Sequence, residues 1–395
     1  MTDRCIYMDH AATTPVRPEV LQAMMPYFTE QFGNASSIYR IGRENRKAVD
    51  AARADVAGAL HADPTEIFFT ASGSEADNWA IKGAAAARAS KGRHLITSAI
   101  EHPAVLNVFE HLGRNGFEIT YLPVDSDGVV HPETLKGAMR PDTILVSVMM
   151  ANNEIGTIQP IAELAAIARE GGALFHTDAV QAAGNIVVDV KALGVDMLTI
   201  SGHKFYGPKG IGALYIRKGL KIEPLLHGGH QERGKRAGTE NVPGIVGMAK
   251  ALVLATGQLD AHAAKLSALR DRVLAGVMER IPHVKLNGHP AQRLPGNLNL
   301  SFRFIEGESL LLMLDMKGIA ASSGSACTSG SLDPSHVLLA IGLPHEIAHG
   351  SLRLSFGDMN TEADADYLLE HLAAIVARLR QMSPLYEDFV RNGGQ

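Results

Sequence analysis

The sequence predicts an α/β protein built on a mostly parallel sheet of seven strands, with a second, smaller α+β domain. Between about residues 64 and 217, short β-branched runs alternate with helical patterns, as expected of βαβ units. A different mixture of strands and helices follows from about residue 264. The chain has 395 residues, enough for roughly two to three domains that bury their own cores.

Seven strands are predicted in the first region. They comprise residues 66–70, 94–98, 117–122, 143–150, 173–177, 197–201 and 213–217. Two helices carry an apolar face at helical spacing, with Val49, Ala52, Val56 and Leu60 in helix 43–60 and Leu368, Leu372, Ile375 and Leu379 in helix 361–380. We interpret both faces as core.

A long helical stretch leads from the first region to the second. It follows residues 239–243 (TENVP) and runs to about residue 281, which is too long for one average helix and predicts a bent connector. Strands are expected at residues 284–287, 297–302 and 351–356. We therefore divide the chain into a large domain of residues 16–263 and a small domain of residues 1–15 and 264–395.

Composition and charge exclude several classes of protein. The net charge is 37 − 42 = −5, and the basic residues are scattered, so neither nucleic acid nor a membrane is an expected partner. Apolar stretches such as residues 144–151 fall short of the ~20 residues that cross a bilayer. The N-terminal residues show no leader pattern, and we expect a cytoplasmic protein.

The two cysteines, Cys5 and Cys327, lie too far apart in sequence for a metal-binding CxxC pair, and two cysteines make no disulfide scaffold. Cys327 stands in a run of small, turn-forming residues, SSGSACTSGS, at 322–331. A thiol in such a loop is exposed and suits a nucleophile that must travel, whereas we expect Cys5 to lie in apolar surroundings. No metal site is expected.

A helix N-terminus after the first strand is a candidate phosphate site. Strand 66–70 runs into residues 71–78 (ASGSEADN), a small-residue turn that opens a helix. Unpaired backbone N–H groups and the helix dipole would favour a phosphate there, helped by the Ser74 hydroxyl. The alternative is that Ser74 is only an N-cap. No Walker or GxGxxG motif follows a strand.

Two neighbouring strand ends supply a carboxylate and an amine. Strand 173–177 ends at Asp178, with Gln181 one turn on, and strand 197–201 leads to Lys204. Pyridoxal phosphate needs a lysine for a Schiff base, an Asp for its pyridinium nitrogen and a helix N-terminus for its phosphate. The alternatives are a solvated surface lysine, and metal ligation by His176 and Asp178, for which the spacing suggests no third ligand.

Two further residues are candidates with plain structural alternatives. His102 begins the helix after strand 94–98, where it is placed to stack on a bound ring or relay protons, or simply to cap the helix. Arg353 in strand 351–356 could clamp a substrate carboxylate, although a single arginine is more often part of a structural ion pair.

The motifs as a set resemble the cysteine desulfurases of the NifS and IscS type, which are fold-type I pyridoxal-phosphate enzymes. The matching segments are residues 7–15 (YMDHAATTP), 69–78, 101–105 (EHPAV), 152–156 (NNEIG), 176–181, 201–210 (SGHKFYGPKG), 232–239 (ERGKRAGT) and 322–331. They extend over essentially the whole chain. The resemblance implies that sulfur is removed from L-cysteine, giving L-alanine and a persulfide that serves iron–sulfur cluster assembly.

The resemblance also implies a role for each site residue. Lys204 would bind the cofactor, Asp178 would pair with the ring nitrogen, and His102 would stack on the ring. Further cofactor contacts would come from Gly73, Ser74, Asn153, Gln181, Ser201, His203 and, from a second subunit of a homodimer, Thr239. Asn34, Asn153 and Arg353 would hold the substrate, and Cys327 would accept the sulfur, pass it to a scaffold or acceptor protein, and transiently ligate a cluster.

Two departures from the family pattern stand out. Ala35 and Tyr39 occupy positions where the family usually has Pro and His, next to Asn34. The chain stops soon after residues 383–386, which favours the NifS-like branch over IscS-type members with a longer tail. A selenocysteine lyase or an aminotransferase of the same fold would share Lys204 and Asp178, but an aminotransferase needs no loop thiol.

Overall fold

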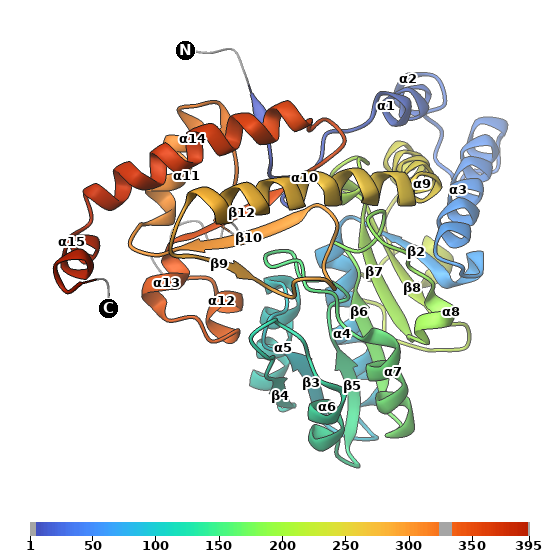
Figure 1. Ribbon diagram of the computed structural model, residues 1–395. Coiled ribbons are helices and arrows are strands. Elements are labelled where there is room, and N and C mark those ends of the chain that lie inside the picture. The colour runs from blue at the N-terminus through green and yellow to red at the C-terminus, as the bar shows by residue number, and fades with distance from the viewer. Residues whose placement is uncertain (1–4, 324–333, 394–395) are drawn as a thin grey trace.

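The computed structural model describes residues 5–323 and 334–393 (Figure 1). Its central sheet has seven strands in the order β2-β8-β7-β6-β5-β3-β4. Their bounds are β2 Ile67–Thr70, β3 His94–Ser98, β4 Glu118–Leu122, β5 Thr143–Ser147, β6 Leu174–Asp178, β7 Met197–Ser201 and β8 Gly212–Ile216. Within this sheet only β8 runs antiparallel to the rest. The predicted mostly parallel sheet is confirmed.

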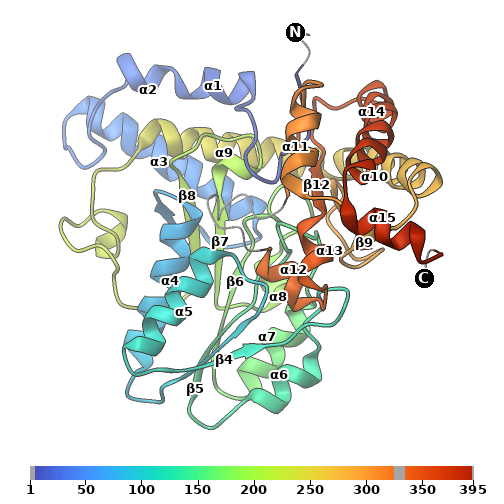
Figure 2. The same cartoon turned by 90° about the vertical axis from the view of Figure 1, so that its left-hand side faces the viewer.

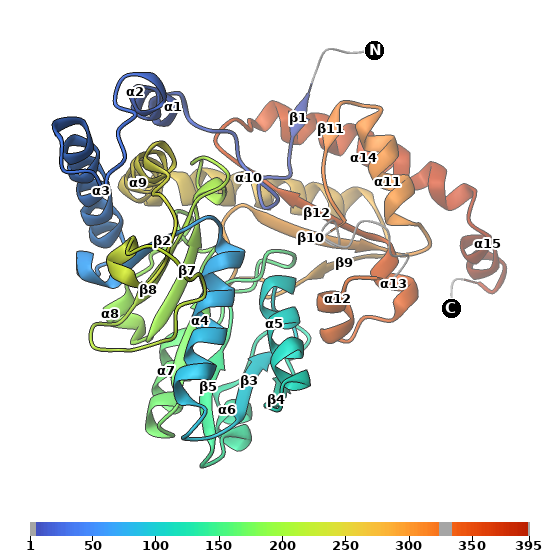
Figure 3. The ribbon, with the colours of Figure 1, turned by 180° about the vertical axis from the view of Figure 1, so that it is seen from behind.

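Helices cover both faces of this sheet because adjacent strand residues point to opposite sides. Phe68 packs with Trp79 and the core of α4 (Gly73–Arg88) and α5 (Pro103–Arg114) on one face. Phe69 joins the core of α3, α7 and α9 on the other. The bounds of those helices are α3 Arg40–Ala59, α7 Ile161–Glu170 and α9 Val242–Gly257. Figure 3 shows α4 and α5 in front of the sheet.

The small antiparallel sheet has the order β12-β10-β9. Its strands are β9 Val284–Asn287, β10 Asn297–Phe302 and β12 Ser351–Ser355, close to the predicted bounds. A second apolar core packs it against α10 (Leu259–Arg280), α11 (Gly307–Asp315) and α14 (Glu362–Gln381). Leu368, Leu372 and Ile375 of α14 are buried there, as the helical pattern predicts.

The first residues of the chain belong beside this small sheet. Strand β1 (Ile6–Tyr7) pairs in parallel with β11 (Ile319–Ala320), and Asp9 forms a bridge with Ser355 at the end of β12. Residues 6–9 thus lie beside the strands of the second unit, and the assignment of residues 1–15 to the small domain stays a prediction. Cys5 is exposed, so the expectation of apolar surroundings for it was wrong. Cys5 precedes β1, which begins at Ile6 and so does not include it.

The predicted connector consists of α9 and α10, which meet at a bend of 74°. Leu266, Leu269 and Val273 of α10 already belong to the second core. The predicted boundary at residues 263 and 264 falls inside α10 and stays a prediction. Within the described residues, no single helix is long and apolar enough to span a membrane, although α9 and α10 satisfy the length and composition test as a bent pair.

The remaining elements are short. They are α1 Pro18–Met24, α2 Pro26–Thr29, α6 Pro132–Ala138, α8 Val190–Leu193, α12 His336–Ala340, α13 His345–His349, α15 Pro384–Arg391, and the 3₁₀ turns η1 Pro64–Glu66, η2 Gly202–Lys204 and η3 Glu232–Gly234. Figure 2 shows α1 and α2 far from α15, at opposite sides of the molecule.

Candidate active site

The predicted cofactor residues lie where parallel strands of the large sheet end. Strands β6 and β7 are parallel neighbours, so Asp178 at the end of β6 and the η2 turn that carries Lys204 share one edge of the sheet. The helices α4 and α5 begin at this same edge, after β2 and β3. Open α/β sheets bind ligands at such carboxyl ends.

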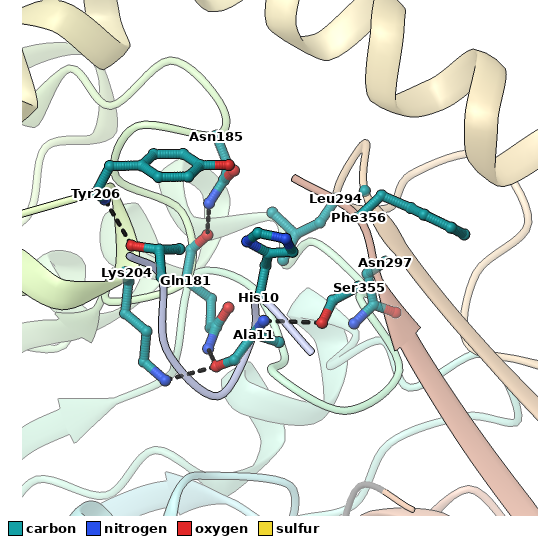
Figure 4. Close-up of a pocket in the computed structure, with 12 residues that line it drawn as sticks. His10, Ala11, Gln181, Asn185, Lys204, Tyr206, Leu294, Asn297, Ser355 and Phe356 are labelled. Atoms are coloured by element: carbon teal, nitrogen blue, oxygen red, sulfur yellow. Dashed lines mark hydrogen bonds between the residues drawn. The ribbon is translucent and has the colours of Figure 1, made fainter. Parts of the chain in front are cut away.

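Lys204 points toward the N-terminal segment of the chain. Its Nζ donates to the carbonyl oxygens of Ala11 at 2.5 Å and Ala12 at 2.8 Å, and Nε2 of Gln181 donates to the Ala11 carbonyl at 2.9 Å (Figure 4). A segment nearly 200 residues away in sequence thus fixes the side chain of Lys204. These two carbonyl acceptors were not among the predicted site residues.

Asp178 is a buried carboxyl group whose pKa is raised by burial and lowered by its neighbours. Its Oδ1 accepts the Val180 N–H at 2.9 Å. Burial raises the pKa of Asp178 to about 6, opposed by this hydrogen bond and by the charge of Lys204. A carboxylate in these surroundings favours a cationic partner, such as a protonated ring nitrogen.

Near Asp178, His176 belongs to a buried polar group whose other members, Ser147 and Asp77, were not predicted. His176 shares a face of β6 with Asp178; its Nδ1 lies 2.8 Å from Ser147 Oγ and its Nε2 lies 3.6 Å from Asp77 Oδ1. Burial lowers the pKa of His176 to about 3, and burial followed by the charge of Asp178 raises the pKa of Asp77. Both ring nitrogens of His176 therefore face side chains of the protein, and His176 supports the strand end.

His102 is both a helix cap and a neighbour of Lys204. It is the N-cap of α5, and its Nδ1 accepts the Ala104 N–H at 3.1 Å. Burial, followed by the charge of Lys204, lowers the pKa of His102 to about 4, so the ring is neutral at pH 7. Because Nδ1 accepts this hydrogen bond, the neutral ring carries its proton on Nε2 and can donate it while lying against a cofactor.

The N-terminus of α4 differs in one detail from the prediction. Ser72 is the N-cap, because its Oγ accepts the Glu75 N–H, and Ser74 lies exposed in the first turn. The Ser-x-x-Glu spacing of Ser72 and Glu75 is a capping signal that could have found it. At Gly73 a Cβ atom would lie 2.9 Å from Val180 Cγ2 and 3.2 Å from Ser201 Cβ. Glycine therefore lets this helix end approach the ends of β6 and β7.

The other predicted phosphate ligands lie in different surroundings. Nδ1 of His203 is 3.1 Å from Thr13 Oγ1, and burial followed by nearby lysine charges lowers the His203 pKa to about 4. Thr239 is exposed, in the loop after η3. In that loop Arg236 forms a two-bond ion pair with Glu75 at 2.8 and 3.1 Å, which ties the loop to the first turn of α4.

Arg353 lies on β12 of the small sheet and contacts residues of the site. Its buried guanidinium donates to Asp9 Oδ1 at 2.6 Å and to the Asn153 carbonyl at 3.2 Å, and its Nε finds no acceptor among the described residues. The ion-pair alternative is thus realised. Asn34 is exposed and its Oδ1 accepts the Ser36 N–H, so no hydrogen bond among the described residues joins it to Arg353.

Cys327 lies outside the described residues. Within the part of the chain that is described, no group of three or more His, Cys, Asp or Glu side chains could hold a metal ion.

A small cavity of about 30 Å³ adjoins Lys204 on the side of the small sheet. Its lining includes His10, Gln181, Tyr206, Asn297 and Ser355 (Figure 4). This volume suits one or two water molecules.

Comparison with known proteins identifies the family. Residues 6–368 match the model of the aminotransferase class-V family. "Cysteine desulfurase IscS" of Methanosarcina thermophila is 60% identical over 383 residues, which is 97% of this chain and 95% of that protein. The chain belongs to the aminotransferase class-V family, among the cysteine desulfurases of the NifS and IscS type. This family placement confirms the resemblance, whereas the NifS-like branch stays a prediction.

Solved structures of family members agree with this placement. A "NifS-like protein" matches with a TM-score of 0.90 and 40% identity over 95% of this chain and 100% of that one. "SspA in complex with cysteine" matches with a TM-score of 0.79 and 37% identity over 90% of this chain and 100% of that one. The fold-type I architecture is thereby confirmed.

Pyridoxal phosphate is the cofactor of this protein, as membership of the family implies. The residues at the sheet edge fit that group. A buried carboxylate at Asp178, an amine at Lys204 and a neutral ring at His102 match its pyridine nitrogen, aldehyde and ring face. Gly73 leaves the α4 terminus open to a phosphate.

The raised pKa of Asp178 predicts a cost in stability for the cofactor-free protein. The folded pKa of about 6 exceeds the ordinary value of 3.8, so the folded state holds the proton more tightly and stability falls as pH rises from about 4 to 6. The difference corresponds to about 3 kcal/mol at pH 7. Asp178→Asn should therefore be more stable than wild type by up to about 3 kcal/mol at pH 7.

Urea unfolding of both cofactor-free proteins checks this prediction. The advantage of Asp178→Asn should shrink as the pH falls from 6 to 4, because the wild-type carboxyl then takes up its proton in the folded state. Equal unfolding free energies at pH 7 would contradict the raised pKa.

Proposed function

We propose that this protein is a cysteine desulfurase that removes sulfur from L-cysteine, releasing L-alanine and leaving a persulfide on Cys327. The observation that carries the proposal is the gathering of Lys204, Asp178 and neutral His102 at one sheet edge, faced by Arg353 from the small sheet. Supporting it, the relative from Methanosarcina thermophila is named a cysteine desulfurase, and one solved relative holds cysteine.

The residues divide the work as follows. Pyridoxal phosphate, when bound, withdraws electrons from the substrate Cα. Asp178 keeps the ring nitrogen protonated, since an anion next to that nitrogen favours its cationic form. The Lys204 amine removes the Cα proton, and Arg353 holds the substrate carboxylate so that this proton faces the amine. Asn153 and Asn34 would complete the substrate contacts.

Sulfur transfer then falls to Cys327. Its thiolate attacks the sulfur of the substrate, so that an S–S bond forms while the Cβ–S bond breaks and its electron pair stays with the alanine part. Protonation of that part releases alanine, with neutral His102 placed to pass the proton. The sulfur remains on Cys327 as a persulfide, available to an acceptor protein.

A product assay tests the proposal. With L-cysteine and a thiol reductant, the protein should form alanine and sulfide in equal amounts. An aminotransferase would instead give an oxo acid without sulfide, and a selenocysteine lyase would act on selenocysteine in strong preference to cysteine. Either result would overturn the assignment.

Assembly and location complete the proposal. Large apolar side chains are exposed along α1, α2 and the following loop, namely Leu21, Met25, Phe28, Phe32, Ile38 and Tyr39. Such a patch is typical of a protein interface, and it supports a homodimer. Persulfide delivery to an iron–sulfur scaffold or other acceptor, transient cluster ligation by Cys327 and a cytoplasmic location belong to the same proposal.

Subunit mixing tests whether Thr239 reaches the cofactor phosphate of the partner chain. Thr239→Glu should empty that site by charge repulsion, and Lys204→Ala inactivates its own site. A hybrid of the two inactive proteins would carry both lesions in one site and none in the other. Activity should return to about a quarter of wild type, because random mixing makes half of the dimers hybrids with one intact site of two.

The alternative is that Thr239 acts within its own chain, where Arg236 of the same loop contacts Glu75 of α4. Mass spectrometry shows whether hybrids form. If hybrids form and stay inactive, Thr239 acts within its own chain.

A further inference from the structure

Asp358, in the turn after β12, is held by contacts from three separate parts of the chain. Arg17 donates to its Oδ2, and His262 Nδ1 lies 2.7 Å from its Oδ1. Its backbone carbonyl accepts from Lys265 Nζ at 2.5 Å, and its backbone N–H donates to the Tyr206 hydroxyl at 2.8 Å. We call Arg17, Tyr206, His262 and Asp358 the Asp358 clamp.

The clamp grips the loop that carries the active-site lysine. Tyr206 lies two residues after Lys204 and has a φ of 66°, a left-handed conformation that a bulky residue adopts only where its surroundings hold it. Those surroundings are visible, because Thr14 Oγ1 accepts the Tyr206 N–H at 2.8 Å and the Arg17 guanidinium lies 4.8 Å from the centre of its ring. The Tyr206 ring is itself buried.

A second connection links the same strand to the other side of Lys204. The Ser355 N–H donates to the Met8 carbonyl at 2.8 Å, and Ser355 Oγ accepts the Ala11 N–H at 2.8 Å. The Ala11 carbonyl in turn accepts from Lys204 Nζ, as Figure 4 shows. Strand β12 and the turn after it therefore hold Lys204 from two sides, and β12 also carries Arg353.

We propose that Asp358 and Tyr206 are positioning residues that set the Lys204 amine relative to the carboxylate site at Arg353. The inference rests on the proposed function, in which Arg353 holds the substrate carboxylate. Arg353 and Asp358 are five residues apart on one strand and its following turn, so a shift of this turn moves both the substrate and the loop of Lys204. The clamp makes the two move together.

The clamp is a permanent feature at working pH. Burial opposes ionisation of Asp358, but its bonds to His262 and Arg17 outweigh burial and lower its pKa to about 2. Asp358 is thus charged at neutral pH, and Asp358→Asn removes its ion pairs with Arg17 and His262.

Three variants test the proposal in the holoenzyme. Asp358→Asn removes the charge and keeps the backbone N–H, Tyr206→Phe removes only the hydroxyl that accepts it, and the third variant combines both. Each single change should lower kcat about tenfold and raise KM for cysteine less than threefold, because binding at Arg353 survives while alignment with the amine is lost. The kcat of the double variant should be no more than about twofold below that of the less active single variant.

A matched control comes from the same domain. Asp366 of α14 makes an exposed two-bond ion pair with Arg272 of α10, with both bonds at 2.8 Å, and neither residue contacts the lysine loop. Asp366→Asn should leave kcat and KM unchanged. It controls for the general effect of losing an ion pair at α10.

Hydrogen exchange of the cofactor-free protein supplies a readout that needs no activity. Amides of residues 9–17 and 202–207 should exchange about ten times faster in Asp358→Asn and Tyr206→Phe than in wild type or Asp366→Asn. Faster exchange with unchanged kcat would overturn the positioning role, and unchanged exchange would overturn the clamp itself.

Two further outcomes are also decisive. Additive losses in the double variant would show that Asp358 and Tyr206 act independently, against the proposal. If Asp358→Asn fails to fold, Tyr206→Phe carries the test alone, since it removes one hydroxyl. A wild-type protein that makes no alanine or sulfide would sink the proposed function, while the exchange experiment would still decide whether the clamp exists.

Discussion

Replacing Lys204 with alanine should lower the formation of alanine and sulfide from cysteine by about 10⁴-fold or more, because one group both binds the cofactor and moves the Cα proton. The protein should also lose its covalent, borohydride-reducible link to pyridoxal phosphate. Its fold should survive, since Lys204 is half-buried and its Nζ donates to backbone carbonyls, at Ala11 and Ala12.

Lys209 provides the matched control for this experiment. It lies five residues further along the same loop and is exposed. Lys209→Ala should keep the absorbance of the bound cofactor and at least half of the wild-type activity. A reducible link that persists in Lys204→Ala would assign the cofactor to another lysine and contradict the site described above.

Cys327→Ser should separate proton chemistry from sulfur transfer. The variant should still bind cysteine and exchange the Cα proton with solvent, because Lys204, Asp178 and Arg353 remain. It should form almost no persulfide, and its sulfide production should fall about 10³-fold, since a serine hydroxyl is a poor nucleophile toward sulfur. Mass spectrometry after incubation with cysteine detects the persulfide, and deuterium incorporation into cysteine reports the proton exchange.

The other cysteine gives the control for this variant. Cys5 is exposed and precedes the first strand. Cys5→Ser should keep full activity, and its persulfide should still map to Cys327. Full sulfide production by Cys327→Ser would show that the sulfur leaves without passing through this thiol.

Strands with clear boundaries were predictable from the sequence. The strands β9 and β10 have the predicted bounds, because Pro282, Gly288 and Pro295 mark where they begin and end. Strand β2 begins at Ile67, one residue later than predicted, because Glu66 belongs to a turn capped by Asp63. The Asp-Pro-Thr-Glu sequence of that turn is a capping pattern that could have been noticed.

Pairings between distant short segments were not predictable in this way. Strand β1 has two residues, which is too short for any period to appear, and its partner is β11. Strand β5 ends at Ser147 although its apolar run continues to residue 151, because the chain leaves the sheet toward the site. Composition carries no information about where such a departure occurs.

In the candidate site, too, local patterns predicted some residues, whereas contacts between distant segments were not predictable. Lys204, Asp178 and His102 follow directly from strand ends and helix starts, which sequence patterns locate. The acceptors on Ala11 and Ala12, and the grip of Asp358 on Tyr206, depend on backbone groups and on a turn of the second domain. The residue type does not indicate which backbone carbonyl will accept a hydrogen bond, so these contacts could not be predicted from the sequence.

The pairing of β1 with β11 also bears on how the chain is made. Ile6 faces Ile319, so 319 − 6 = 313 residues must be added before the first strand meets its partner. At about 5–20 residues per second, synthesis leaves that strand waiting for roughly 15–60 s. During this time the segment that holds Lys204 lacks its partners on β11 and β12. The sheet of β2–β8 can form on the ribosome, but this segment gains those two contacts only when the last quarter of the chain has emerged.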